Sequence, residues 1–113
     1  FDRIYCPTSF WDEYKSLFRR SASEYKRHLS KLYENLRILD QGGSALKMPR
    51  FEKLENADGL YAIRHQSVIN PRVVFAFQSA DGIVVLLTSF KEKSKSDYDA
   101  AMKRAKSILR ELE

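Results

Sequence analysis

The chain has 113 residues, 43% of them hydrophobic and 12% aromatic, which supports one domain with a two-layer core and argues against intrinsic disorder. Lysine and arginine total 20 against 15 aspartates and glutamates, so the net charge is +5 and the pI is about 9.4; this favours an anionic partner, although similar excesses occur in proteins that bind nothing charged. No apolar run approaches the ~20 residues of a membrane span, and the single cysteine, Cys6, excludes an intrachain disulfide and favours a reducing cytoplasm.

The first part of the chain predicts a short strand and two helices. Residues 1–6 alternate between apolar and polar side chains, as in a strand. Pro7, Thr8 and Ser9 end this strand and offer capping hydroxyls, and apolar residues at helical spacing follow through Phe18. Ser21 and Glu24 form a capping box that opens a longer helix, which Gly42-Gly43 ends. Its apolar stripe consists of Tyr25, Leu29, Leu32, Leu36 and Leu39.

The second part predicts a three-stranded antiparallel meander followed by a helix. Three short runs at 60–65, 71–77 and 83–90 are rich in β-branched and aromatic residues, and Asp81-Gly82 is a hairpin signal between the last two. A brief strand at 51–54 can precede them. Ser96 is the expected cap of the last helix, whose apolar stripe is Tyr98, Met102, Ala105, Leu109 and Leu112. The order predicts a single α+β domain over 1–113, with a sheet of about four strands packed on one face by all three helices.

Two arginines inside apolar strands are the main candidates for function. Strand alternation puts Arg64 and Arg72 on one face, which we expect to be free of helices. That face would be a shallow groove, floored by Ala62, Val74 and Ala76 and rimmed by Arg64, Arg72, Lys91, Lys93 and Lys95. Guanidinium groups match phosphate oxygens in bidentate geometry. The alternative is that strand arginines only solubilise the sheet or protect its edge.

Other kinds of chemistry lack a matching pattern. His28 and His65 have no second histidine or cysteine at ligand spacing, so we expect no metal. The sequence has neither a phosphate-binding glycine-rich loop nor a Gly-x-Ser-x-Gly nucleophile elbow. Tyr98 can face the groove as a stacking or proton-transferring group, or it can pack in the core as its helical spacing suggests.

Four segments together carry a family resemblance, over about residues 50–110. They are Leu60-Tyr-Ala-Ile-Arg64, Arg72-Val-Val-Phe-Ala-Phe77, Ile83-Val-Val-Leu-Leu87 with Phe90-Lys-Glu-Lys-Ser94, and Lys103-Arg-Ala-Lys106. As a set they resemble the RelE/ParE toxin superfamily, and most closely its HigB-like branch in bacterial and phage toxin–antitoxin modules. The resemblance implies a RelE-like fold and a ribosome-dependent endoribonuclease that cuts mRNA without a metal or other cofactor, by attack of the RNA 2′-hydroxyl on the adjacent phosphate.

The resemblance also implies roles for particular residues. Arg64, Arg72 and Lys93 match catalytic positions, and the expected RNA contacts are Lys47, Lys53, His65, Lys91, Lys95 and Tyr98. The chain departs from the family pattern at Ala62, where the family has Glu, and at Glu92, where it has the first lysine of the loop. No clear general base is left, and Arg64, His65 and Tyr98 are the candidates.

The implied partners are a cognate antitoxin, of the helix-turn-helix type, in a hetero-oligomer with the toxin, and mRNA on the ribosome; no membrane partner is expected. Two other functions stay open. The superfamily also contains toxins that inhibit DNA gyrase instead of cutting RNA. A basic face can equally belong to a non-catalytic module that binds RNA or an acidic protein.

Overall fold

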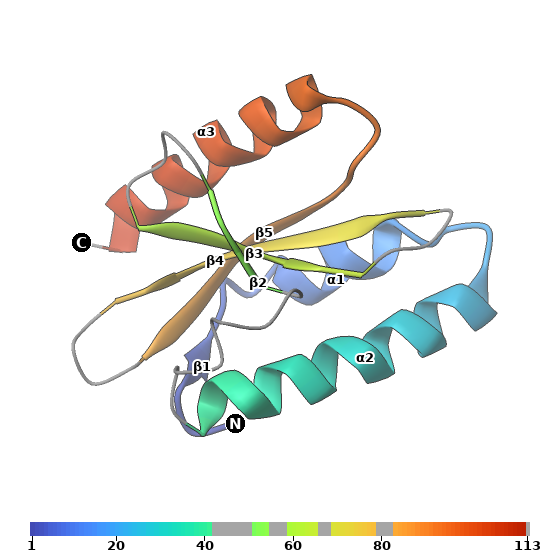
Figure 1. Cartoon of the computed structure of the whole chain (residues 1–113), viewed down its shortest axis with the longest axis horizontal. Helices are drawn as coiled ribbons and strands as arrows, with labels where there is room; N and C mark the ends of the chain where they lie inside the picture. The colour runs from blue at the N-terminus through green and yellow to red at the C-terminus, as the bar shows by residue number, and fades with distance from the viewer. Residues whose placement is uncertain (42–50, 55–58, 66–68, 79–82, 113) are drawn as a thin grey trace.

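A computed structural model shows a five-stranded sheet between two layers of helices (Figure 1). It describes residues 1–41, 51–54, 59–65, 69–78 and 83–112. The helices are α1 (Phe10–Ser16), α2 (Ala22–Asp40) and α3 (Lys95–Leu112). The strands are β1 (Ile4–Tyr5), β2 (Phe51–Lys53), β3 (Leu60–Arg64), β4 (Pro71–Phe77) and β5 (Val84–Lys91). None of the described helices is long and apolar enough to cross a membrane.

The sheet has the order β1-β5-β4-β3-β2, with β1 parallel to β5 and every other pair antiparallel. The meander of β3, β4 and β5 is confirmed, and the brief strand at 51–54 is present as β2, so the sheet has five strands where about four were expected. The predicted Asp81-Gly82 turn and the Gly42-Gly43 helix stop lie outside the described residues.

The capping predictions are confirmed in part. The hydroxyl of Ser21 accepts a hydrogen bond from the backbone N–H of Glu24, as expected for the start of α2. The Glu24 carboxylate does not return to Ser21 but pairs with Arg27, so only half of the capping box forms. The last helix begins at Lys95, before the Ser96 expected to cap it.

Helices cover both faces of the sheet, so the prediction of a helix-free face is wrong. α1 and α2 pack on the face formed by Ile63, Val73, Phe75, Val84 and Leu86. α3 packs alone on the opposite face, formed by Leu60, Ala62, Val74, Ala76, Val85 and Leu87 (Figure 1). The small side chains expected to floor a groove are instead buried in the same core as Ala101 and Ala105 of α3, where their size allows the helix to approach the sheet.

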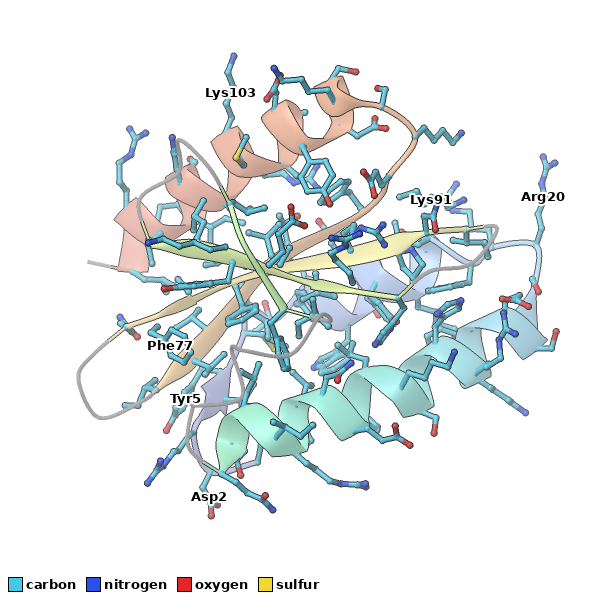
Figure 2. All side chains as sticks on the ribbon, viewed as in Figure 1. Asp2, Tyr5, Arg20, Phe77, Lys91 and Lys103 are labelled. Carbon is cyan, nitrogen blue, oxygen red and sulfur yellow. The ribbon has the colours of Figure 1, made fainter. Side chains whose placement is uncertain are left out.

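The charged side chains lie mostly outside these layers. Arg20 between α1 and α2, Lys91 at the end of β5 and Lys103 on α3 point into solvent (Figure 2). Leu112, expected in the buried stripe of α3, is instead 46% exposed, at the last residue of the helix.

Side chains from α1 and α3 meet at the edge of β5 beyond its two-residue pairing with β1. The Glu13 carboxylate accepts hydrogen bonds from the backbone N–H of Ser89 at 2.7 Å and the hydroxyl of Thr88 at 2.8 Å. Arg104 donates to the Thr88 hydroxyl at 2.9 Å and to the Ser89 carbonyl at 3.2 Å. Side chains therefore satisfy the edge backbone at Ser89, where a neighbouring strand would otherwise do so.

We predict that Glu13→Ala lowers the free energy of unfolding by about 1–3 kcal/mol, because it leaves the buried N–H of Ser89 without its partner. Chemical denaturation measures this value. Asp12→Ala is the matched control, since Asp12 also lies in the first turn of α1 and makes none of these contacts. Equal losses in the two variants would assign the effect to the helix dipole and not to the edge of β5.

Candidate functional site

A polar groove of about 690 Å³ lies between the β2–β3 edge of the sheet and the first half of α3. It is open to solvent, and both charge signs are present on its walls. The residues that line it are Glu52, Lys53, Leu54, Arg64, Glu92, Lys95, Tyr98, Asp99 and Met102.

Strand register brings the two expected arginines together. Arg64 on β3 lies directly opposite Arg72 on β4, and both project toward α3 from the same face of the sheet. The prediction that they share a face is therefore confirmed. The face is the one that α3 covers, however, and Tyr98 of this helix contacts the guanidinium group of Arg72.

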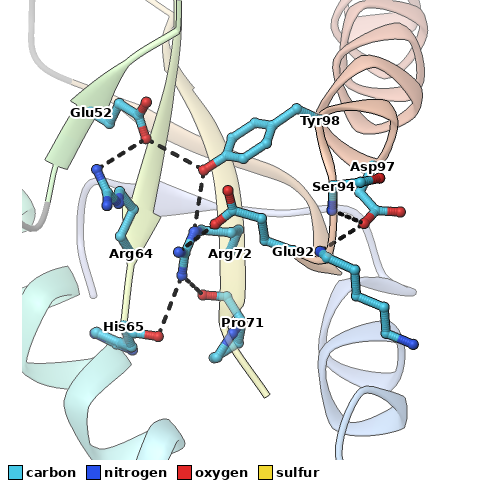
Figure 3. A network of polar contacts seen from close by, with 10 residues as sticks. Glu52, Arg64, His65, Pro71, Arg72, Glu92, Ser94, Asp97 and Tyr98 are labelled. Carbon is cyan, nitrogen blue, oxygen red and sulfur yellow. Dashed lines mark hydrogen bonds and ion pairs between the residues drawn. The ribbon is translucent and has the colours of Figure 1, made fainter. Parts of the chain in front are cut away.

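Arg72 is buried, with 3% of its surface exposed, and protein groups contact each of its guanidinium nitrogens (Figure 3). Nε donates to the Tyr98 hydroxyl at 3.2 Å, and Nη1 donates to the carbonyls of Pro71 and His65 at 3.1 and 3.4 Å. Nη2 forms an ion pair with Glu92. Arg72 does not line the groove, so its expected place on the groove rim is wrong: backbone carbonyls draw the side chain inward.

Arg64 is the accessible arginine of the pair. Its side chain is 37% exposed and lines the groove, and Nη1 lies 3.6 Å from a carboxylate oxygen of Glu52 on β2. At this distance and exposure the pair is loose and screened by solvent. Arg64 can therefore leave Glu52 for another anion at small cost.

The hydroxyl of Tyr98 lies between these two pairs. It accepts from Nε of Arg72 and lies 3.4 Å from the Glu52 carboxylate, to which it donates, while its ring packs edge-on against Phe90 (Figure 3). Burial raises the pKa of the Tyr98 hydroxyl, and the hydrogen bond from Arg72 opposes this only in part. The phenol is therefore protonated at neutral pH. Tyr98 both packs and faces the groove, the two roles that the sequence left open.

The other predicted site residues are spread over three places. Lys53 and Lys95 line the groove, while Lys91 and Lys93 are exposed and lie outside its lining. Lys47 lies outside the described residues. The ring of His65 lies on the α2 side of the sheet, and only its backbone carbonyl reaches Arg72. Sequence reasoning missed Glu52 as a site residue and noted Glu92 only as a departure from the family. No local signal pointed to either pairing, because Glu52 and Glu92 are far in sequence from the arginines that they contact.

Behind the groove, a buried imidazole stack links the sheet to α2. His65 contacts the Asn35 side-chain amide at 2.5 Å, and its ring stacks on His28 at 6.0 Å between centroids. His28 is fully buried, and Phe18 stacks on its other face. Nε2 of His28 lies 3.4 Å from Glu24, yet within the described residues neither ring nitrogen makes a well-aligned hydrogen bond. Among the described side chains no three His, Cys, Asp or Glu come together to hold a metal ion.

Comparison with known proteins gives the family. The model of the phage derived protein Gp49-like family (DUF891) matches residues 22–110. The chain belongs to this family. No curated protein matches the sequence.

The fold is similar to that of the E. coli toxin RelE. A crystal structure of the isolated toxin superposes with a TM-score of 0.52 at 20% identity, covering 89% of this chain and 95% of RelE. A doubly substituted RelE in the free state superposes with a TM-score of 0.51 at 20% identity, covering 89% of this chain and 94% of that one. The resemblance to the RelE superfamily and the RelE-like α+β fold expected from the sequence are thereby confirmed.

We predict that the protein loses stability in mild acid through His28. Burial lowers the pKa of His28, and Arg27 and Lys31 lower it further, while Glu24 opposes them. The unfolded chain therefore binds a proton that the folded one rejects below a pH of about 6.5, and the free energy of unfolding falls as the pH drops through that range. His28→Phe, which keeps the ring stack, should lose less stability between pH 7.5 and 5.5 when melting temperatures are compared. Parallel declines in both proteins would contradict this.

Proposed function

We propose that this protein is the toxin of a type II toxin–antitoxin module and that it cleaves mRNA on the ribosome. Membership of the Gp49-like family and the RelE-like fold support the toxin assignment. The observation that supports cleavage is the Tyr98 hydroxyl, held in an open groove between Glu52 and Arg72, with Arg64 beside it. A base, an acid and a cation within one groove are the groups that phosphodiester cleavage needs in the absence of a metal.

In the proposed reaction, the RNA 2′-oxygen attacks the adjacent phosphorus as the bond from phosphorus to the 5′-oxygen breaks. Glu52 takes the 2′-hydroxyl proton and Tyr98 gives its proton to the leaving 5′-oxygen, which leaves a 2′,3′-cyclic phosphate and a 5′-hydroxyl. Arg64 leaves Glu52 to contact the phosphate, where charge builds up in the transition state. The Glu52–Tyr98 hydrogen bond then returns the proton to the phenolate and restores the starting state.

The proposal gives the basic residues a binding role. Lys53 and Lys95 on the walls of the groove would contact the RNA backbone. Lys91 and Lys93 next to it would add positive charge along the path of the RNA, and Lys47, which lies outside the described residues, stays an RNA contact expected from the sequence alone. The partners would be mRNA on the ribosome and, in the resting cell, a cognate helix-turn-helix antitoxin bound in a hetero-oligomer. The place of action would be the cytoplasm.

We predict that induced wild-type protein stops growth and produces codon-phased mRNA cuts, detectable by mapping RNA 5′ ends. Tyr98→Phe and Glu52→Gln keep the packing and should each reduce cleavage by about 10²–10⁴-fold, because each removes one proton-transfer group. Glu34→Gln, on the exposed side of α2, is the charge-matched control and should cut like wild type.

The other functions that the sequence left open give different results. Growth arrest with double-strand DNA breaks and intact mRNA would indicate gyrase inhibition. RNA binding without cuts, unchanged in Tyr98→Phe, would indicate a binding module without catalysis. Either result would contradict the nuclease.

A further inference from the structure

One carboxylate separates the buried arginine from the groove. Glu92 and Tyr98 line the groove, whereas Arg72, directly behind them, does not. The Glu92 side chain is 33% exposed, and its carboxylate binds Nη2 of Arg72 at 2.5 Å (Figure 3). Nη2 of Arg72 is therefore covered by a partly exposed carboxylate that can reach solvent.

The remaining contacts of Arg72 do not depend on Glu92. Tyr98 holds Nε, and the carbonyls of Pro71 and His65 hold Nη1. If the Glu92 side chain rotates outward, these three partners keep the guanidinium in place and leave Nη2 as a donor aimed at the groove. The backbone need not move, since the N–H of Glu92 stays bonded to the carbonyl of Asn70 at 3.0 Å.

The resemblance already implies a catalytic role for Arg72 toward the substrate phosphate; we infer that Glu92 occupies this position in the resting protein and blocks it, and that a phosphate group of the substrate displaces the carboxylate. A carboxylate and a phosphate present similar oxygen pairs to a guanidinium, so one can replace the other. Lys91, Lys93 and Lys95 flank Glu92 in sequence and are exposed. Their positive charge attracts a phosphate to the position that the Glu92 carboxylate occupies and must leave. This inference deepens the proposed function and rests on it for the identity of the substrate.

Asp99 supplies the matched control. It lines the same groove, and its replacement by asparagine changes the net charge by the same amount as Glu92→Gln. The structure places Glu92, and not Asp99, on the guanidinium of Arg72. If only the net charge of the groove matters, the two variants should strengthen phosphate binding equally. If the Glu92 carboxylate must be displaced, only Glu92→Gln should strengthen phosphate binding strongly.

The test measures binding of a fluorescent oligodeoxynucleotide, which lacks the attacking 2′-hydroxyl and cannot be cut. Glu92→Gln should bind about tenfold more tightly than wild type, the value of one charged hydrogen bond, and Asp99→Asn about twofold or less. In an Arg72→Gln background the gain from Glu92→Gln should fall to that of Asp99→Asn. Equal gains for the two carboxylate variants, or a full gain without Arg72, would overturn the inference.

A second measurement uses the wild-type protein, so it does not depend on whether the variants fold. Inorganic phosphate is titrated into ¹⁵N-labelled protein while the side-chain Nε signals of Arg72 and Arg64 are followed. Saturable shifts at Arg72 are expected, and shifts confined to Arg64 would overturn the inference. Neither assay requires RNA cleavage, so phosphate binding at Arg72 without mRNA cuts would contradict the nuclease and leave the subsite standing.

Discussion

The buried guanidinium of Arg72 is the interaction on which the site depends. A charge taken out of water costs several kcal/mol unless partners replace its hydration. Here a tyrosine of α3, two backbone carbonyls and the first residue after β5 replace it. Because these partners come from separate segments, the groove acquires its shape only once the sheet and α3 have docked. Arg72 thus links the stability of the core to the geometry of the surface beside it.

The groove exists because α3 crosses only part of its face of the sheet. α3 packs chiefly on β5 and β4, with Ala101 and Ala105 buried in this core, so the space between the first half of the helix and β2 and β3 is left open as the groove. Tyr98 stands in this space, one helical turn before Ala101. The same packing that buries the second face of the sheet therefore also delivers the hydroxyl to the two charge pairs.

The charge of the site is not that of a surface with uncompensated basic residues. Each arginine has a carboxylate partner, and these two pairs differ in accessibility: Arg64–Glu52 is partly exposed and loose, while Arg72–Glu92 is buried on the arginine side. A site of this kind has little net charge of its own, and the positive potential comes from the lysines around it. One set of residues would then attract the anion, and a different set would act on it chemically.

Local patterns in the sequence determined the elements, their order and the shared face of the two arginines. β-Branched runs, capping residues and strand alternation act between neighbours in the chain, so they can be read without a fold. They also carried the family resemblance, because the segments that match are short and contiguous.

The tertiary structure alone decided which helix covers which face, since alternation shows that a strand has two faces but not what packs on each. The near-continuous apolar run at 83–90 was the available sign that both faces of β5 are covered. Tertiary structure also decided the partners of the arginines. Glu52 and Glu92 are 40 residues apart, and only the register of β2 on β3 and the docking of α3 bring their carboxylates to either side of one tyrosine.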